Sequence, residues 1–322
     1  MTAIDFTKRN TALEINPIRS AIDIHITDHG SSWLWTVFSL FAFFAVAHIF
    51  AYGFTSSHKK GLKKTLLVVP LCIYSILAVA YFTMASNLGY TGTPTEFSHV
   101  TTSEDIGVRQ IFYAKYIAYF LSWPWLMMII EVTTHDAEFF NEGDFFGRLI
   151  ALFQGLFTKI LATSVFVLGL LIGSLIESTY KWGYFTFAVA ALLFAEVYIF
   201  INSFNAWRLT TSRTGILVVY FDLLVWILYP IAWGLSEGGN KIQPDSEAVF
   251  YGILDLITFL VVPLALTWIN FYHVDNEYFS KVWIFNVRRS QADPEKEIGE
   301  TPRHSGDTAV APVGVPTDEQ VV

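Results

Sequence analysis

The stretch Tyr251-Gly-Ile-Leu-Asp-Leu-Ile-Thr-Phe-Leu260 lies at the centre of a long apolar segment, Ala248–Phe271, whose one charged residue is Asp255. An apolar segment of about 20 residues is long enough to cross a lipid bilayer as a helix. A charge inside the bilayer is costly and usually belongs to a functional site. The stretch therefore predicts a membrane helix with a functional acid near its middle.

Six further apolar segments precede this one in the 322-residue chain, which is 53% apolar and has a mean hydropathy of +0.47. Each must be a helix, because the bilayer core offers no water to bond an open backbone. We predict an all-α membrane protein with a seven-helix bundle at residues 32–272, an N-terminal tail at 1–31 and a largely disordered C-terminal tail at 273–322. The six other spans are Trp33–Phe54, Thr65–Ala85, Gln110–Val132, Ile160–Ile176, Trp182–Phe204 and Thr214–Leu235.

Basic residues gather in alternate loops, and loops rich in lysine and arginine stay in the cytoplasm. This asymmetry predicts that the N-terminus lies outside the cell and the C-terminus inside. The net charge of −8 and the scattered cations exclude a nucleic-acid surface. The basic loops carry Lys59, Lys60, Lys63, Lys64, Arg148, Arg208 and Arg213, whereas the alternate loops carry Arg109, Lys181 and Lys241.

Lys115 and Asp255 lie well inside the third and seventh spans. Opposite charges buried together cost less than either charge buried alone. We therefore predict that the two side chains face each other, directly or through water. Such a pair could serve a function or could only fix the packing of the helices, and the sequence leaves both interpretations open.

The remaining intramembrane charges lie nearer the cytoplasmic ends of their helices. Lys159 precedes an apolar run, so its long side chain is expected to reach the cytoplasmic surface. Glu131, Glu196 and Asp222 could form a proton relay or could each be hydrated at the interface. The motif Gly169-Leu-Leu-Ile-Gly173 permits close helix approach, either to a neighbouring helix of the bundle or to a second copy.

The sixth and seventh spans carry a more specific pattern. Trp226-Ile-Leu-Tyr-Pro-Ile-Ala-Trp233 resembles the microbial-rhodopsin pattern Trp-x-x-Tyr-Pro-x-x-Trp, whose rings line the retinal pocket. The acids Glu237, Glu247 and Asp255 follow it. The resemblance implies that the two glutamates correspond to the extracellular proton-release group of the pumps and that Asp255 corresponds to part of the counterion.

The attachment point, the proton acceptor and the internal proton donor of the light-driven pumps are all replaced, and Lys115 and Tyr119 stand where the pumps carry Arg and Trp. Phe259 stands four residues after Asp255, where the rhodopsins carry the lysine that binds retinal. A Schiff base needs a primary amine, so covalent retinal is excluded at this position. The third span carries Ala118 and Ile129 where the pumps carry the proton acceptor and the internal proton donor. Light-driven pumping by the known mechanism is therefore not expected.

This combination resembles the fungal opsin-related membrane proteins of the 30 kDa heat-shock protein family. The resemblance implies a stress protein of the plasma membrane, without a cofactor, that modulates a partner such as the proton-pumping ATPase. Microbial rhodopsins often trimerise, so a homo-oligomer is also expected by analogy. An enzyme is not expected, because the sequence has no nucleophile–base pair, phosphate loop or metal-ligand spacing.

Two other functions stay open. The first is a light-independent proton or ion channel or transporter, with a path formed by Lys115, Asp255, Glu237, Glu247, Asp222, Glu196 and Glu131. The second is a sensor of a non-covalently bound apolar ligand. Its site would be the vestigial retinal pocket, formed by Tyr119, Trp226, Tyr229, Trp233 and Phe259.

Overall fold

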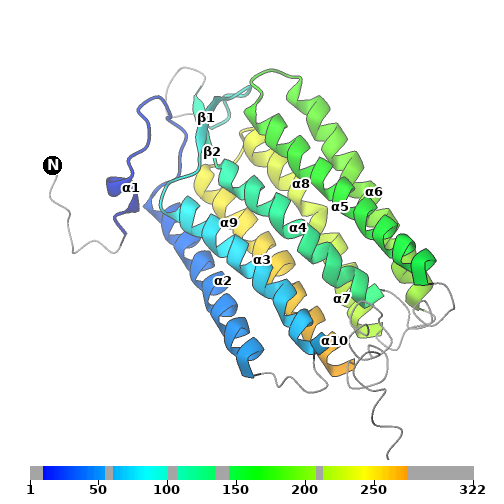
Figure 1. Ribbon diagram of the computed structural model, residues 1–322. Coiled ribbons are helices and arrows are strands. Elements are labelled where there is room, and N and C mark those ends of the chain that lie inside the picture. Colours follow the sequence, from blue (N-terminus) through cyan, green and yellow to red (C-terminus); the bar gives the residue numbers. More distant parts are fainter. Residues whose placement is uncertain (1–9, 55–60, 101–106, 135–144, 208–212, 274–322) are drawn as a thin grey trace, which may run out of the picture.

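The computed structural model describes residues 10–54, 61–100, 107–134, 145–207 and 213–273. Its long helices lie side by side in one bundle (Figure 1). Within the described residues, 7 helical spans are long and apolar enough to cross a membrane. The predicted all-α, seven-helix membrane architecture is therefore confirmed. The predicted C-terminal tail lies outside the described residues, apart from its first residue, His273.

The first five spans are single helices. Their outward-facing side chains are apolar and exposed, as with Phe43 in the first and Phe187 in the fifth. Such faces suit lipid tails. Proline inside a membrane helix is tolerated because neighbouring groups form hydrogen bonds with the backbone carbonyl that the proline leaves unbonded. The five helices are α2 (Asp28–Phe54), α3 (Gly61–Ala85), α4 (Tyr113–Thr134), α5 (Phe145–Leu175) and α6 (Lys181–Trp207).

Two of these helices extend well beyond the predicted spans. The sequence predicts a first span from Trp33 and a fourth from Ile160, whereas α2 begins at Asp28 and α5 at Phe145. Thr27 caps α2, because its hydroxyl accepts a hydrogen bond from the His29 amide at 3.2 Å. Hydropathy marks the bilayer core, and a helix continues past that core wherever its polar ends find partners.

The sixth and seventh spans each combine α-helices with one short π-helix. The sixth consists of α7 (Arg213–Trp226), α8 (Leu228–Trp233) and the π-helix η2 (Gly234–Gly238). The seventh consists of α9 (Pro244–Asp255), the π-helix η3 (Leu256–Val261) and α10 (Val262–His273). Pro230 and Pro263 have no backbone N–H, so each removes one rung of the helical hydrogen-bond ladder. Short π-helical turns often mark functional positions.

A small sheet closes one end of the bundle, which we call the hairpin end (Figure 1). Strand β1 (Thr91–Pro94) pairs with β2 (Val108–Ile111) in antiparallel register, with Thr91 opposite Ile111. Ile24, from the N-terminal segment, forms a parallel bridge with Arg109 on the other side of β2. The sheet thereby fixes the position of Arg109 over the end of the bundle.

The N-terminal segment is part of the fold from residue 10 onward. It includes the short helix α1 (Ala12–Ile15). Asn16 donates a hydrogen bond to the Ser86 carbonyl at 2.7 Å, and Thr27 binds the carboxylate of Asp245. Residues 10–27 of the predicted N-terminal tail are therefore folded against the hairpin end, because their polar groups find specific partners there.

The motif Gly169–Gly173 in α5 faces the interior of the bundle. A Cβ added to Gly169 would lie 2.9 Å from the Cβ of Ala188 in α6, and one added to Gly173 would lie 3.0 Å from the ring of Trp233. The motif therefore brings α5 close to α6 and to the sixth span. Of the two alternatives for this motif, the structure shows packing within the bundle.

Candidate functional site

Four charged side chains form a buried cluster just beneath the hairpin end. We call Arg109, Lys115, Glu237 and Glu247 the charge cluster, and all four are buried. The Lys115 ammonium lies 2.9 Å from Glu237 Oε1 and 3.0 Å from Glu247 Oε1, while Arg109 Nη2 lies 2.7 Å from Glu247 Oε2. Two cations therefore balance two carboxylates, and every charge is paired.

Neutral groups complete the bonding of the charge cluster. The hydroxyls of Tyr116 and Ser174 donate to Glu237 Oε2, the latter at 2.5 Å. Arg109 Nη1 donates to Asn240 Oδ1 at 2.7 Å and to the Ile242 carbonyl at 2.9 Å. A buried ion pair is favourable only when its remaining polar atoms are also bonded, and this cluster largely meets that condition.

The sequence missed Arg109 as a member of the cluster, because it lies in the loop region before the third span. The β1–β2 pairing and the bridge to Ile24 direct this residue back onto the bundle. Arg109 and Lys115 are six residues apart, yet they reach the same glutamate from a strand and from a helix. Only the tertiary fold brings them together.

Of the two predicted arrangements, the direct pairing of Lys115 with Asp255 is wrong, and pairing through water stays a prediction. The ammonium of Lys115 binds Glu237 and Glu247 instead, and it lies 3.7 Å from the centre of the Tyr251 ring. Tyr251 precedes Asp255 by one helical turn in α9, so Lys115 meets the seventh span one turn closer to the hairpin end. Two carboxylates and an aromatic face at that level satisfy the ammonium more fully than one carboxylate deeper in the bundle.

Three tyrosine hydroxyls hold Asp255. Tyr81 of α3 donates to Oδ2 at 2.5 Å, Tyr229 of α8 donates to Oδ1 at 2.8 Å, and Tyr119 of α4 lies 2.8 and 3.0 Å from the two oxygens. Hydrogen bonds to an ionised carboxylate are about twice as strong as those between neutral groups. Asp255 thus joins three helices through neutral donors and has no cation within ion-pairing distance among the described residues.

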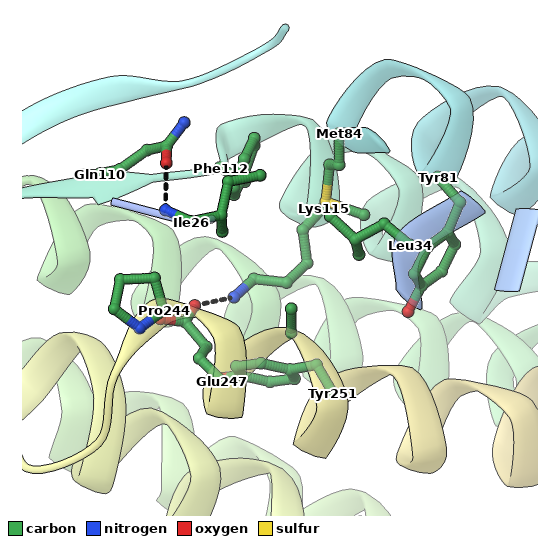
Figure 2. Close-up of a pocket in the computed structure, with 11 residues that line it drawn as sticks. Ile26, Leu34, Tyr81, Met84, Gln110, Phe112, Lys115, Pro244, Glu247 and Tyr251 are labelled. Atoms are coloured by element: carbon green, nitrogen blue, oxygen red, sulfur yellow. Dashed lines mark hydrogen bonds and ion pairs between the residues drawn. The ribbon is translucent and has the colours of Figure 1, made fainter. Parts of the chain in front are cut away.

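A small pocket lies between the charge cluster and Tyr81 (Figure 2). Its volume is about 20 Å³, enough for about one water molecule. Figure 2 shows the Lys115 ammonium pointing down to Glu247, with Ile26 and Phe112 above it and the Tyr81 ring at the right. The pocket lies between Lys115 and Tyr81, the tyrosine that binds Asp255.

Aromatic rings fill the centre of the bundle, in the region where the sequence predicts a vestigial retinal pocket. The Phe259 ring stacks on Tyr119 at 5.8 Å between centroids and meets Trp123 edge-on at 5.7 Å. Trp123 in turn packs against Trp226 at 4.4 Å and against Tyr229 at 6.3 Å. These five rings, which we call the ring cluster, are all buried. Trp123 is the member that the sequence analysis missed.

Trp233 lies apart from the ring cluster, on the side of α5 and α6. Its ring stacks on Phe185 at 5.0 Å, and its indole N–H donates to Ser174 Oγ at 2.7 Å. Ser174 also binds Glu237, so Trp233 supports the charge cluster through that hydroxyl. Four of the five predicted pocket residues therefore lie together, and the fifth belongs to a neighbouring contact.

The other acids lie in the half of the bundle away from the hairpin end. Glu131 forms a buried ion pair with Lys159, whose ammonium also lies 5.4 Å from the Tyr198 ring. The expectation that Lys159 reaches the surface is wrong, and so is hydration of Glu131 at an interface. Glu131 and Lys159 lie on facing helices, α4 and α5, and each offsets the cost of burying the other.

Asp222 and Glu196 are separate from that pair. Asp222 is fully buried, with the Thr258 hydroxyl and the Trp226 indole as its polar neighbours. Interfacial hydration of Asp222 is therefore also excluded. Glu196 is 8% exposed, with one oxygen buried and unbonded. Since Asp222 bonds to neither glutamate, the three acids do not form a directly bonded relay.

Comparison with known proteins places these features in a family. The profile of the family described as "Bacteriorhodopsin-like protein" matches residues 29–277. The chain is 37% identical to the "30 kDa heat shock protein" of Saccharomyces cerevisiae, over 96% of this chain and 95% of that protein. It is 36% identical to the "Opsin-like protein carO" of Fusarium fujikuroi, over 82% of this chain and 81% of that protein.

A solved structure has the same fold. The light-driven proton pump of Coccomyxa subellipsoidea superimposes with a TM-score of 0.64, at 25% sequence identity, over 76% of this chain and 98% of that one. The described bundle thus matches almost the whole length of a light-driven pump, and it carries Phe259 and the ring cluster at its centre.

Proposed function

Since this chain belongs to the bacteriorhodopsin-like protein family, we propose that it is an opsin-like stress protein of the plasma membrane that does not bind retinal covalently. It acts by modulating a membrane partner such as the proton-pumping ATPase. Its N-terminus lies outside the cell and its C-terminus in the cytoplasm. The relative named as a heat shock protein supports the stress role, since the two chains align over almost their full lengths.

The observation that carries this proposal is the ring cluster. Phe259 provides no amine for a Schiff base. The Phe259 and Trp123 rings are fully buried and in contact, so they take up room that a bound chromophore would need. A close-packed aromatic centre adds to the stability of the bundle and suits a scaffold better than a ligand site.

The polar groups on either side of the ring cluster also favour a scaffold. The charge cluster is internally neutral and bonded on most sides. Asp255 lies on one side of the rings, held by Tyr119 and Tyr229. Asp222 lies one helical turn before Trp226, toward the other end of the bundle. A proton or ion crossing the bundle would have to pass the buried rings between the two acids.

The test is reconstitution of the purified chain with the proton-pumping ATPase in liposomes. We expect the rates of ATP hydrolysis and proton uptake to change in proportion to the added chain and to saturate near a fixed ratio. A light-driven rhodopsin of the same fold, kept in the dark, is the matched control and should leave both rates unchanged. Unaltered ATPase kinetics at saturating chain would refute the proposed partner.

A second candidate is a light-independent proton or ion conductor. It is favoured by the polar series that runs from Arg109 through Lys115 and the small pocket to Tyr81 and Asp255. Dark flux of protons and cations into liposomes that contain the chain alone tests this function. Flux that falls in Asp255→Asn would establish conduction, whereas flux equal to that of empty vesicles would exclude it.

A further inference from the structure

Two buried acids, one on each side of the ring cluster, are connected by hydroxyl groups. The Thr258 hydroxyl lies within hydrogen-bonding reach of Asp222 and also of the Tyr229 hydroxyl. Tyr229 in turn donates to Asp255 Oδ1 at 2.8 Å. All four residues are buried, and each is at most 1% exposed. A series of side-chain oxygen atoms thus runs from one acid to the other.

The register of the last two spans explains this series. Asp222 and Tyr229 are seven residues apart, close to two helical turns, so their side chains lie on one face of the sixth span. Asp255 and Thr258 are three residues apart in the seventh span, so they also share a face. The hydrogen bond between Tyr229 and Asp255 shows that the two faces meet.

The Thr258 hydroxyl is available to both of its neighbours. Thr133 and Thr163 donate their hydroxyls to the backbone carbonyl four residues earlier, at 2.7 and 3.0 Å. Thr258 makes no such bond within the described residues. It lies in η3, where the regular backbone ladder is interrupted. Its hydroxyl can therefore turn between Asp222 and Tyr229.

The two acids differ in how firmly they hold a proton. Asp222 has the Thr258 hydroxyl and an indole N–H as its polar neighbours, and the buried lysines of the described bundle pair with other acids. A buried carboxyl without a counter-charge is least costly as the neutral, protonated acid. Asp255 has three tyrosine hydroxyls around its oxygens, and such bonds stabilise the ionised form. Asp222 is therefore the proton donor and Asp255 the acceptor.

The series continues from Asp255 toward the hairpin end. Tyr81 donates to Asp255 Oδ2 at 2.5 Å and lines the small pocket together with Glu247 (Figure 2). The pocket has room for about one water molecule. The Glu247 side chain is 9% exposed, so it reaches the edge of the buried region. A proton on Asp255 thus has a short route to the surface at this end.

We propose that the hydroxyls of Thr258 and Tyr229 relay protons between the two acids, past the ring cluster. Asp222 gives its proton to Thr258 Oγ1 while the Thr258 hydroxyl gives its own proton to Tyr229 Oη. The Tyr229 hydroxyl gives its original proton to the Asp255 carboxylate. One O–H bond breaks and one forms at each hydroxyl oxygen, so the net change is one proton moved from Asp222 to Asp255. Rotation of the two hydroxyls resets the relay.

The relay deepens the second candidate function and rests on it only for net transport. Hydroxyl groups both donate and accept, so they pass protons, whereas the close-packed rings beside them leave no room for a larger ion. The relay would therefore make any conductor of this fold specific for protons. Exchange of the Asp222 proton needs the relay but no flux across the membrane, so the two can be tested separately.

The test is hydrogen–deuterium exchange of the Asp222 carboxyl in the purified full-length chain, followed by infrared spectroscopy in detergent. Transfer to heavy water shifts the carbonyl band of a protonated carboxyl. Asp222→Asn identifies this band by removing it, and Asp222→Glu by moving it. We expect Thr258→Val and Tyr229→Phe each to slow the exchange by about tenfold or more. Thr258→Ser keeps the hydroxyl and should exchange as fast as the unmutated chain.

Thr267→Val is the matched control, because it removes another buried hydroxyl of the seventh span, nine residues beyond Thr258, and should leave the exchange unchanged. Slow exchange in Thr258→Val, with dark proton flux into liposomes equal to that of empty vesicles, would support the relay and exclude the conductor. Equally fast exchange in Thr258→Val and the unmutated chain would overturn the relay even if flux were observed. Tyr229→Phe decides the question if Thr258→Val does not fold. The absence of a carbonyl band assigned to Asp222 would also overturn the relay.

Discussion

Removal of the Lys115 ammonium is the sharpest test of the charge cluster. Lys115→Met keeps most of the side-chain volume but leaves Glu237 and Glu247 with Arg109 as their one cation. Breaking a buried ion pair by removing one partner costs about 3–5 kcal/mol, because a buried charge is left uncompensated. We expect a loss of about 4 kcal/mol in the free energy of unfolding.

The double variant Lys115→Met/Glu237→Gln should recover much of that loss. It restores neutrality, since Arg109 still balances Glu247 across 2.7 Å, and the glutamine can still accept from Ser174. Replacing a whole buried pair by neutral groups is often close to neutral, so we expect a net loss of about 1–2 kcal/mol. The second substitution should therefore recover about 2–3 kcal/mol of the loss caused by the first.

The assay is reversible unfolding in mixed micelles by titration with sodium dodecyl sulfate, followed by circular dichroism. Lys181→Met is the matched control, because Lys181 pairs with Glu96, which is 16% exposed, at 3.1 Å. Lys181 is itself only 4% exposed, but water can reach the Glu96 carboxylate that the substitution leaves behind, so the loss should be smaller than that of Lys115→Met. The reasoning fails if Lys115→Met lies within about 1 kcal/mol of the unmutated chain, or if the double variant loses the sum of the single losses.

Three other substitutions test the remaining features of the bundle. Phe259→Lys incubated with all-trans retinal should give no pigment that absorbs visible light, because Trp123 fills the centre of the bundle. The double variant Phe259→Lys/Trp123→Ala should give such a pigment. A pigment from the single variant would show that the rings do not block the site. Gly169→Leu should destabilise the bundle by about 2 kcal/mol or more in the micelle assay, because even a Cβ at this position would lie 2.9 Å from the Cβ of Ala188 in α6. Ala188→Gly in the same background should relieve part of the loss. Lys159→Met should lower the free energy of unfolding by about 3–5 kcal/mol, because it leaves the Glu131 charge uncompensated. Adding Glu131→Gln should recover most of this loss, and failure to recover it would contradict the pairing.

The sequence located the spans well and the limits of the helices less well. Every predicted span corresponds to a helical span of the structure, because about 20 apolar residues in a row have no other stable arrangement in a bilayer. The ends at Asp28 and Phe145 were missed because those turns are polar or amphipathic, and their limits depend on caps and contacts.

The sequence predicted most residues of the candidate site but not which of them bond to one another. The acids of the last two spans and most rings of the ring cluster were identified from the sequence. The partners were not, since Tyr81 lies 174 residues from Asp255 and Lys115 lies 122 residues from Glu237. Arg109 was counted as a loop cation because its approach depends on the pairing of β2 with β1 and Ile24.

By itself, the sequence determined that this chain crosses a membrane seven times and that it carries a phenyl ring in place of the retinal-binding amine. The first fact follows from the length of the apolar runs, and the second from the resemblance of the seventh span to the retinal-binding helix of microbial rhodopsins. Tertiary structure alone decided which buried charges neutralise one another and that Asp222 is fully buried. The physical reason is that pairing energies inside a bilayer depend on distances of a few ångströms between helices, and only packing sets those distances.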